Sequence, residues 1–128
     1  MKTNLGILAA FVVLLTCSLL FVAFKKPAQK FATAHFMYNP PEEDPYGEDN
    51  VKDLDNWSYV EDPNQCPTGN NRACVIEVSD TYYNTSSGDP VLNTSGPNQA
   101  SISTTSTLTG NYKVASTGGG IVDFENKN

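Results

Sequence analysis

The sequence predicts a small, mainly β domain with one short helix and one disulfide, placed after an N-terminal apolar helix. Short runs of β-branched and aromatic residues are separated by clusters of Pro, Gly and Asn, a pattern typical of strands joined by turns. Two cysteines enclose a turn-rich loop that runs directly into the most apolar of these strands. An uncharged apolar run precedes all of them. Together these observations predict a domain of about four or five strands.

The first segment is a membrane-directed run from Leu5 to Phe24, uncharged throughout and closed by Lys25. About 20 apolar residues are enough for a helix to span a bilayer. A charged start followed by an apolar stretch is also typical of a secretory signal peptide. Cys17 leaves a lipoprotein interpretation open, although the apolar run continues beyond it. Residues 1–24 are therefore predicted to be a cleaved signal peptide or a retained membrane anchor.

The rest of the chain divides into a tether at 25–33 and a domain at 34–128. Disulfides persist outside the reducing cytosol, so the predicted cysteine bridge favours export of this part. The predicted localisation is the periplasm or the cell surface, with attachment to the inner membrane if the anchor is retained.

Beyond residue 24 the chain carries seven Lys and Arg against fourteen Asp and Glu, a net charge of −7. Contacts with nucleic acid and with anionic lipid come mainly from Lys and Arg, so this charge argues against both as partners. Leu, Ile, Val and Phe make up 16 of these 104 residues, which predicts a thin core. A small domain buries a smaller share of its surface than a large one, so the disulfide, the aromatic residues or a partner must add stability.

The domain begins with a predicted strand at 34–38, which ends where Asn39 is followed by two prolines. Proline cannot donate to a strand ladder and stops the pairing. The stretch 42–62 that follows holds nine Asp and Glu and is predicted to be mostly a solvated surface.

Within this acidic stretch, the three-residue spacing of Val51, Leu54 and Trp57 predicts a short helix. Asp49 or Asn50 is the expected N-cap, because a side-chain oxygen there can accept from the free N–H groups of the first turn. The helix is expected to end near Trp57, its main anchor.

Cys66 and Cys74 stand eight positions apart, with Pro, Gly and two Asn between them. These turn formers let the backbone reverse sharply enough to bring the cysteines within bridging range. A zinc site would need more ligands than one His and one cysteine pair supply, and a free redox pair stays open. The predicted disulfide leads into a strand at 75–78 and is expected to pin that strand to the region of Trp57.

Sixteen Ser and Thr lie between residues 79 and 117. Alternation over 102–109 predicts a half-buried edge strand, and the same composition equally predicts a flexible stalk, so the segment 79–111 is the candidate for a flexible part. Beyond it, the runs 112–116 and 121–124 flank a glycine turn, which predicts a hairpin.

The acidic stretch also suggests calcium, because carboxylates are among the ligands that this cation prefers. Aligning Gly47 with the glycine of an EF-hand loop departs from the motif at several ligand positions, and the nearby prolines prevent a good entering helix. Looser metal binding stays open through four weak candidates: Glu42, Asp44, Asp53 and Asp55. No cofactor is predicted.

The motifs do not indicate an enzyme. His35 is the one histidine of the chain, and no G-x-S-x-G elbow marks an activated serine. His35 is therefore interpreted as a strand residue rather than a general base. The three glycines at 118–120 lack the Lys-Ser/Thr of a phosphate-binding loop and are interpreted as a turn.

Several features follow one another over residues 1–80: an apolar leader that ends Phe-Lys-Lys-Pro, then Phe36-Met37-Tyr38-Asn39-Pro40-Pro41, Asn56-Trp57, the cysteine pair, and Ala73-Cys74-Val75-Ile76-Glu77-Val78. In this order they resemble a group of short exported proteins of Bacteroidota that have no assigned activity. The Ser/Thr-rich tail departs from that group. The resemblance implies export to the cell envelope and the disulfide.

The predicted function is that of a non-enzymatic envelope or cell-surface protein with a structural or interaction role. A protein partner, or a second copy of the chain, would pair with its edge strands by strand addition. The alternative is a small extracellular module that binds calcium or a glycan through the acidic loop 42–62 and a set of aromatics expected to be exposed: Tyr46, Trp57, Tyr59, Tyr82 and Tyr83.

Overall fold

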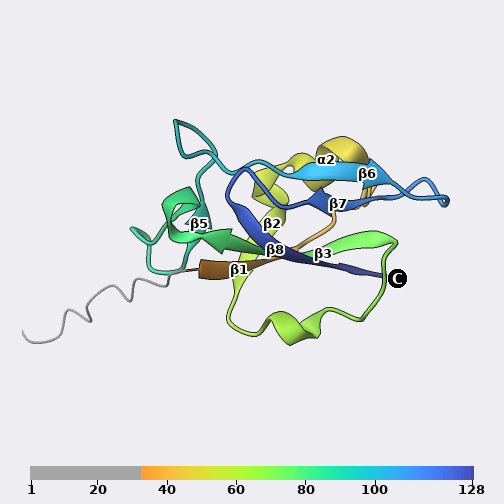
Figure 1. Ribbon diagram of the computed structural model, residues 1–128, viewed down its shortest axis with the longest axis horizontal. Helices are drawn as coiled ribbons and strands as arrows, with labels where there is room; N and C mark the ends of the chain where they lie inside the picture. The colour runs from red at the N-terminus through yellow and green to blue at the C-terminus, as the bar shows by residue number, and fades with distance from the viewer. Residues whose placement is uncertain (1–32) are drawn as a thin grey trace, which may run out of the picture.

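The computed structural model describes residues 33–128, which form a mainly β domain with one α-helix (Figure 1). The predicted fold class is confirmed: the domain is β-rich and carries one disulfide. The membrane-directed run at 5–24 and nearly all of the tether lie outside these residues, so both stay predictions. In the described part no helix is long and apolar enough to cross a membrane.

A four-stranded antiparallel sheet in the order β2-β1-β3-β8 forms the centre of the domain. Its strands are β1 (Thr33–Tyr38), β2 (Trp57–Val60), β3 (Arg72–Ser79) and β8 (Ile121–Lys127). The predicted strands at 34–38 and 75–78 are confirmed as β1 and the centre of β3. β1 stops directly before Asn39 because the two prolines that follow cannot continue the ladder.

Two short antiparallel ribbons complete the β structure. β4 (Tyr83–Asn84) pairs with β5 (Val91–Leu92), and β6 (Ser103–Ser106) pairs with β7 (Tyr112–Ser116). The helix α2 (Glu48–Lys52) and the β6–β7 ribbon lie together on one side of the central sheet, and the loop that leads into β3 passes on the other side (Figure 1).

The predicted hairpin of 112–116 with 121–124 is wrong in its pairing. Both segments are strands, and the glycine turn between them is present, because the backbones of Gly118 and Ile121 exchange two hydrogen bonds of 2.9 and 3.0 Å. Beyond this turn the strands diverge, since β7 pairs with β6 and β8 pairs with β3. The apolar strand β3 needs a neighbour on each side, and β8 fills one of these places. This long-range pairing outweighs the local turn signal.

The predicted helix is shorter than expected. α2 has Gly47 at its N-cap position, where the sequence suggested Asp49 or Asn50. Asp53 ends the helix with an extended backbone, and its carboxylate accepts from the N–H of Asp55. This side-chain cap starts a separate 3-10 turn, η1 (Leu54–Asn56).

Trp57 is consequently the first residue of β2 and not the last turn of a helix. The apolar spacing nevertheless predicted burial correctly, because Val51, Leu54 and Trp57 all lie in the core. The indole N–H of Trp57 donates to the carbonyl of Val51 at 3.0 Å, which ties β2 to α2. A buried indole needs such a partner, because an unpaired N–H would remain desolvated.

The core lies between one face of the sheet and the layer made by α2 and the β6–β7 ribbon. Its largest fully buried side chains are Phe36, Ile76, Val51, Val78 and Val114. The segment 79–111 is not a stalk, because it adds four buried residues to this core: Tyr83, Leu92, Ala100 and Ile102. The predicted edge strand at 102–109 is confirmed only over β6, and beyond it Leu108 is fully exposed in the turn between β6 and β7.

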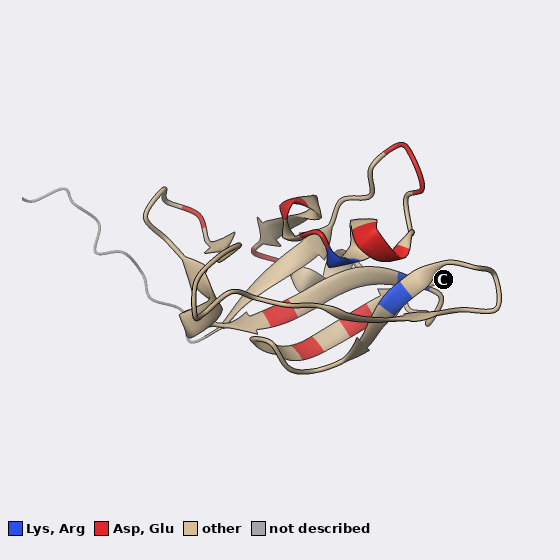
Figure 2. Ribbon diagram, turned by 90° about the horizontal axis from the view of Figure 1, so that it is seen from above, with Lys and Arg blue, Asp and Glu red and all other residues tan. Residues whose placement is uncertain are grey.

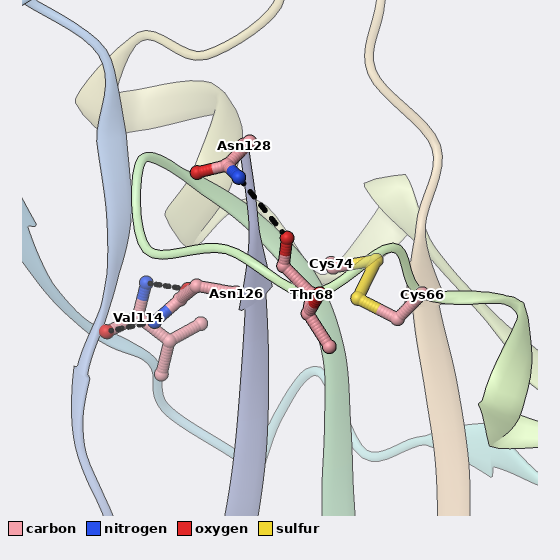
Figure 3. Close-up of a disulfide and its surroundings, with 6 residues drawn as sticks. All are labelled: Cys66, Thr68, Cys74, Val114, Asn126 and Asn128. Carbon is pink, nitrogen blue, oxygen red and sulfur yellow. Dashed lines mark hydrogen bonds between the residues drawn. A yellow bond between two sulfur atoms is a disulfide. The ribbon is translucent and has the colours of Figure 1, made fainter.

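One buried polar side chain joins the sheet to the ribbon. The side-chain amide of Asn126, on β8, accepts from the N–H of Val114 and donates to the carbonyl of Val114, each at 3.1 Å (Figure 3). Asn126 is only 8% exposed. Both polar ends of the buried amide are therefore satisfied, and β7 is held against β8 without a backbone ladder.

Candidate functional site

Cys66 and Cys74 form the predicted disulfide, with their Cα atoms 6.0 Å apart (Figure 3). Both are buried and pack with Val75 and Met37 in a small apolar cluster of their own. The expectation that the bridge pins β3 to the region of Trp57 is wrong, because Trp57 belongs to the main core and the bridge does not.

An irregularity in the ladder of β3 with β8 explains this separation. The register shifts between Ala73 and Val75. Such a bulge lets consecutive residues leave the normal alternation of faces. Ala73 packs into the main core, whereas Cys74 and Val75 both join the disulfide cluster. The disulfide therefore fastens the loop 66–74 onto the face of the sheet that does not carry the main core.

The same face carries three carboxylates and one histidine, which we call the acidic face: His35, Glu77, Asp123 and Glu125. His35 on β1 lies opposite Glu77 on β3, and Glu77 lies opposite Asp123 on β8. Together with Pro63, Val75 and Phe124 they line a small open cavity of about 70 Å³. Figure 2 shows acidic positions side by side on neighbouring strands of the sheet.

The acidic face lacks a cationic side chain among residues 33–128. Four Lys and Arg are described, and each has a partner elsewhere. Lys52 pairs with Glu48 on α2, and the Nζ of Lys113 donates to Asn70 at 2.7 Å. The charged ends of Arg72 and Lys127 lie 5.2 and 5.7 Å from the ring centroid of Tyr46. No described Lys or Arg is thus left to neutralise the three carboxylates of the acidic face.

The four weak calcium candidates are not brought together. Among residues 33–128 no group of three or more His, Cys, Asp or Glu is placed to hold a metal ion. The Asp53 carboxylate caps η1, and the backbone carbonyl of Asp44 accepts from the N–H of Gly47 and from the amide of Asn50. Glu42 and Asp55 are exposed. Calcium binding by this loop stays a prediction without a preformed site.

The aromatic side chains expected to be exposed are not available to stack against a glycan. Trp57 and Tyr83 are buried, and Tyr46, Tyr59 and Tyr82 are partly buried against the main core. That expectation is therefore wrong, and the glycan interpretation loses the feature on which it rested. The prediction of exposure is wrong because Tyr and Trp have large apolar rings. In a domain with few aliphatic residues, burying these rings supplies much of the core.

Tyr38 shows how deeply these rings are placed. Its hydroxyl donates to the carbonyl of Pro45 at 2.7 Å, and its ring centroid lies 5.1 Å from that of Trp57. Burial, helped by the nearby Tyr46 and acidic residues, raises the pKa of Tyr38 to about 12. Burial also raises the pKa of Tyr83. These tyrosines hold the fold together and do not offer a reactive phenolate near neutral pH.

His35 lies where the sequence suggested, on a strand, and the residues around it do not form a catalytic set. No serine or cysteine lines the cavity beside it. The cavity volume of about 70 Å³ is far below the roughly 300 Å³ at which small-molecule sites begin. Two larger, shallow grooves of about 340 and 400 Å³ flank Asn70 and are lined mostly by amides and hydroxyls.

The sequence contained a signal for the acidic face that a residue-by-residue search overlooks. Asp123 and Glu125 alternate along one strand and Glu77 stands in another, so each strand carries carboxylates on one face only. Bringing them together requires the pairing of β3 with β8, whereas the sequence predicts that 121–124 pairs with 112–116 in a hairpin.

The comparisons with known proteins add no relative: no family model matches the chain, and neither a curated protein nor a solved structure is similar to it. The resemblance to exported proteins of Bacteroidota stays a prediction, and the site is argued from its geometry.

Proposed function

We propose that this chain is an exported, non-enzymatic envelope or cell-surface protein that binds a cationic protein segment on its acidic face. One observation carries the proposal: Glu77, Asp123 and Glu125 surround His35 on a sheet face where no described Lys or Arg is free to balance them.

The charge of the domain supports a cationic partner. Residues 33–128 hold four Lys and Arg against fourteen Asp and Glu, and each of the four cations is engaged away from this face. Complementary charge across an interface speeds encounter and selects the partner more than it adds affinity. Association should therefore be fast and selective for Lys- or Arg-rich segments, and added salt should weaken the binding.

The form of the acidic face supports a macromolecular partner. Its cavity is too small to enclose a metabolite, whereas a sheet face presents rows of side chains to a broad surface. The disulfide fixes the loop 66–74 along the border of this face, so the contact surface is ordered before the partner arrives.

Export is supported by two independent features. The apolar run from Leu5 to Phe24 has the length and flanking charge of a signal peptide or anchor. The buried Cys66–Cys74 bridge suits an oxidising compartment such as the periplasm or the cell surface.

The proposal is tested with a cationic probe and two variants of equal charge. The first variant neutralises the acidic face with Glu77→Gln, Asp123→Asn and Glu125→Gln. The second neutralises three exposed carboxylates elsewhere with Glu42→Gln, Asp55→Asn and Asp89→Asn. Binding of a deca-lysine peptide is followed by NMR shift changes and calorimetry at low salt.

We expect the peptide to shift the amides of β3 and β8 in the parent protein. The acidic-face variant should bind about tenfold or more weakly, whereas the second variant should bind nearly as the parent does. Equal losses in the two variants would show a general effect of net charge and would overturn the proposal. Absence of binding to the parent protein would overturn it as well.

A further inference from the structure

Four of the longer strands lie at the edge of a sheet, namely β2, β6, β7 and β8. Three of these edges are obstructed, and the outer edge of β7 bonds to Asn126 and Tyr46. β5 packs beside β2. On β8, the Asp123 carboxylate accepts from the backbone N–H of Phe124 at 2.8 Å, and charged residues recur along the strand. Charges and blocked N–H groups are typical of edges that resist pairing with another chain.

The outer edge of β6 is not obstructed in this way. The direction of the β6 backbone groups follows from the hydrogen bonds that β7 makes. Both backbone groups of Val114 bond to the side chain of Asn126. The N–H of Tyr112 donates to the carbonyl of Tyr46 at 2.8 Å. Val114 and Tyr112 therefore direct their backbone groups away from β6.

In an antiparallel ladder, a residue opposite one that points outward also points outward. Thr104 lies opposite Val114, and Ser106 lies opposite Tyr112. Their backbone N–H and C=O groups are consequently directed away from β7. Within residues 33–128 no backbone group is bonded to the N–H of Thr104 or of Ser106.

The sequence of β6, Ser-Thr-Thr-Ser, has no charge, no proline and no apolar side chain. Thr105 and Ser106 are exposed. Glu48, which the hydroxyl of Thr104 contacts at 3.5 Å, is paired with Lys52. β6 is thus a neutral edge on a strongly acidic domain.

We propose that β6 is a self-recognition edge, which pairs antiparallel with β6 of a second copy of this chain. Two copies with fourteen carboxylates each repel one another wherever those groups meet, and the β6 edge is a place where none is left unpaired. The pairing joins two-stranded ribbons, which are weakly stable alone, into one four-stranded sheet. It uses a surface separate from the acidic face and does not depend on the cationic partner.

Two-fold symmetry restricts the register. With Thr105 on the axis, Thr104 of one copy lies opposite Ser106 of the other, and each such pair exchanges two backbone hydrogen bonds. Thr and Ser side chains opposite one another add favourable cross-strand contacts. Every residue of this register lies within the described strand β6, from Ser103 to Ser106. One arrangement therefore satisfies the outward backbone groups of Thr104 and Ser106 in both copies.

The test is the mass of the exported protein by sedimentation equilibrium, with complementary variants at Thr105. We expect the parent protein to form dimers, and Thr105→Glu and Thr105→Lys each to weaken self-association by about tenfold or more, because identical charges then meet at the axis. An equimolar mixture of the two variants should regain the dimer. Val122→Glu adds a charge at an exposed position of β8 and serves as the matched control with unchanged self-association.

Hydrogen exchange supplies the second readout. The amides of Thr104 and Ser106 should gain protection as the protein concentration rises. Thr105→Glu should abolish this gain and leave the melting temperature unchanged at low concentration, where the parent protein is also monomeric. A parent protein that stays monomeric overturns the proposal. So does a dimer that persists in Thr105→Glu, or one that is lost in Val122→Glu.

Discussion

The side-chain amide of Asn126 pairs with both backbone groups of Val114 as a strand residue would, although β8 and β7 belong to different sheets. Each bond is 3.1 Å long, and Asn126 is the buried polar residue of the described core. Removing one partner of a buried hydrogen bond costs more than the bond itself, because the other partner stays desolvated. This single side chain therefore couples the stability of the ribbon to that of the sheet.

Asn126→Asp is expected to lower the free energy of unfolding by about 3 kcal/mol or more, since a buried carbonyl loses its donor and a charge is buried. The carboxylate can accept from the N–H of Val114 but cannot donate to its carbonyl, and its charge is buried without a cationic partner. Urea unfolding measures the loss. Asn98→Asp makes the same change at an exposed position and should leave the midpoint nearly unchanged. If Asn126→Asp unfolds at the same urea concentration as Asn98→Asp, the coupling does not exist.

Cys74→Ser is expected to lower the free energy of unfolding by about 2.5 kcal/mol, the chain-entropy value for a loop of about 8 residues. The bridge limits the unfolded chain and seals the small cluster with Val75. Thermal melting with and without reductant provides the control, since the reductant should destabilise the parent and leave Cys74→Ser unaffected. A variant that melts like the oxidised parent would show that the loop contributes little to stability.

Stability should fall as pH rises from about 10 to about 12, because burial raises the pKa of Tyr38 to about 12. In this window the folded chain keeps a proton that the unfolded chain releases, so the folded state loses its advantage as the pH increases. A shift from 10 to about 12 corresponds to roughly 2–3 kcal/mol. Urea unfolding at several alkaline pH values measures this slope.

Tyr38→Phe is the control for the alkaline slope. It removes the hydrogen bond to Pro45 and the titrating group together, so we expect a loss of about 1 kcal/mol at neutral pH and a shallower decline above pH 10. Some decline should persist, because burial raises the pKa of Tyr83 in the same direction. An unchanged slope in Tyr38→Phe would assign the alkaline loss to other groups.

Gly120→Ala is expected to destabilise the domain more than Gly110→Ala does. Both glycines have positive φ, +92° and +80°, so alanine adds similar backbone strain of about 1–2 kcal/mol at each. A Cβ at Gly110 meets open space, whereas a Cβ at Gly120 would come within 2.3 Å of the Tyr82 ring. The difference in melting temperature isolates the effect of that contact. Equal melting temperatures would mean that Tyr82 moves aside freely.

The sequence predicted features that depend on neighbouring residues. The prolines after Asn39 marked the end of β1, and the spacing of the cysteines marked the disulfide. The apolar spacing of Val51 and Leu54 predicted burial. It did not predict where the helix stops, because the side chain of Asp53 caps a new turn there.

Features that depend on pairing between segments distant in the sequence could not be predicted from the sequence. The turn at Gly118 is real, but nothing local to it reveals that β8 continues beside β3 while β7 joins β6. The acidic face depends on the same pairing, because Glu77 and Asp123 meet only across β3 and β8. The orientation of the β6 edge likewise follows from the bonds of Asn126 to a residue in another sheet.

The place of β8 in the central sheet also sets when the domain can fold. β3 is complete once residue 79 has been synthesised, but its neighbour on one side is made from residues 121–127. A growing chain that ends before residue 121 has neither this strand nor the Asn126 link, so one side of β3 has no neighbouring strand. The complete central sheet therefore needs residues 121–127, and we expect a chain truncated after Thr117 to show no cooperative thermal transition.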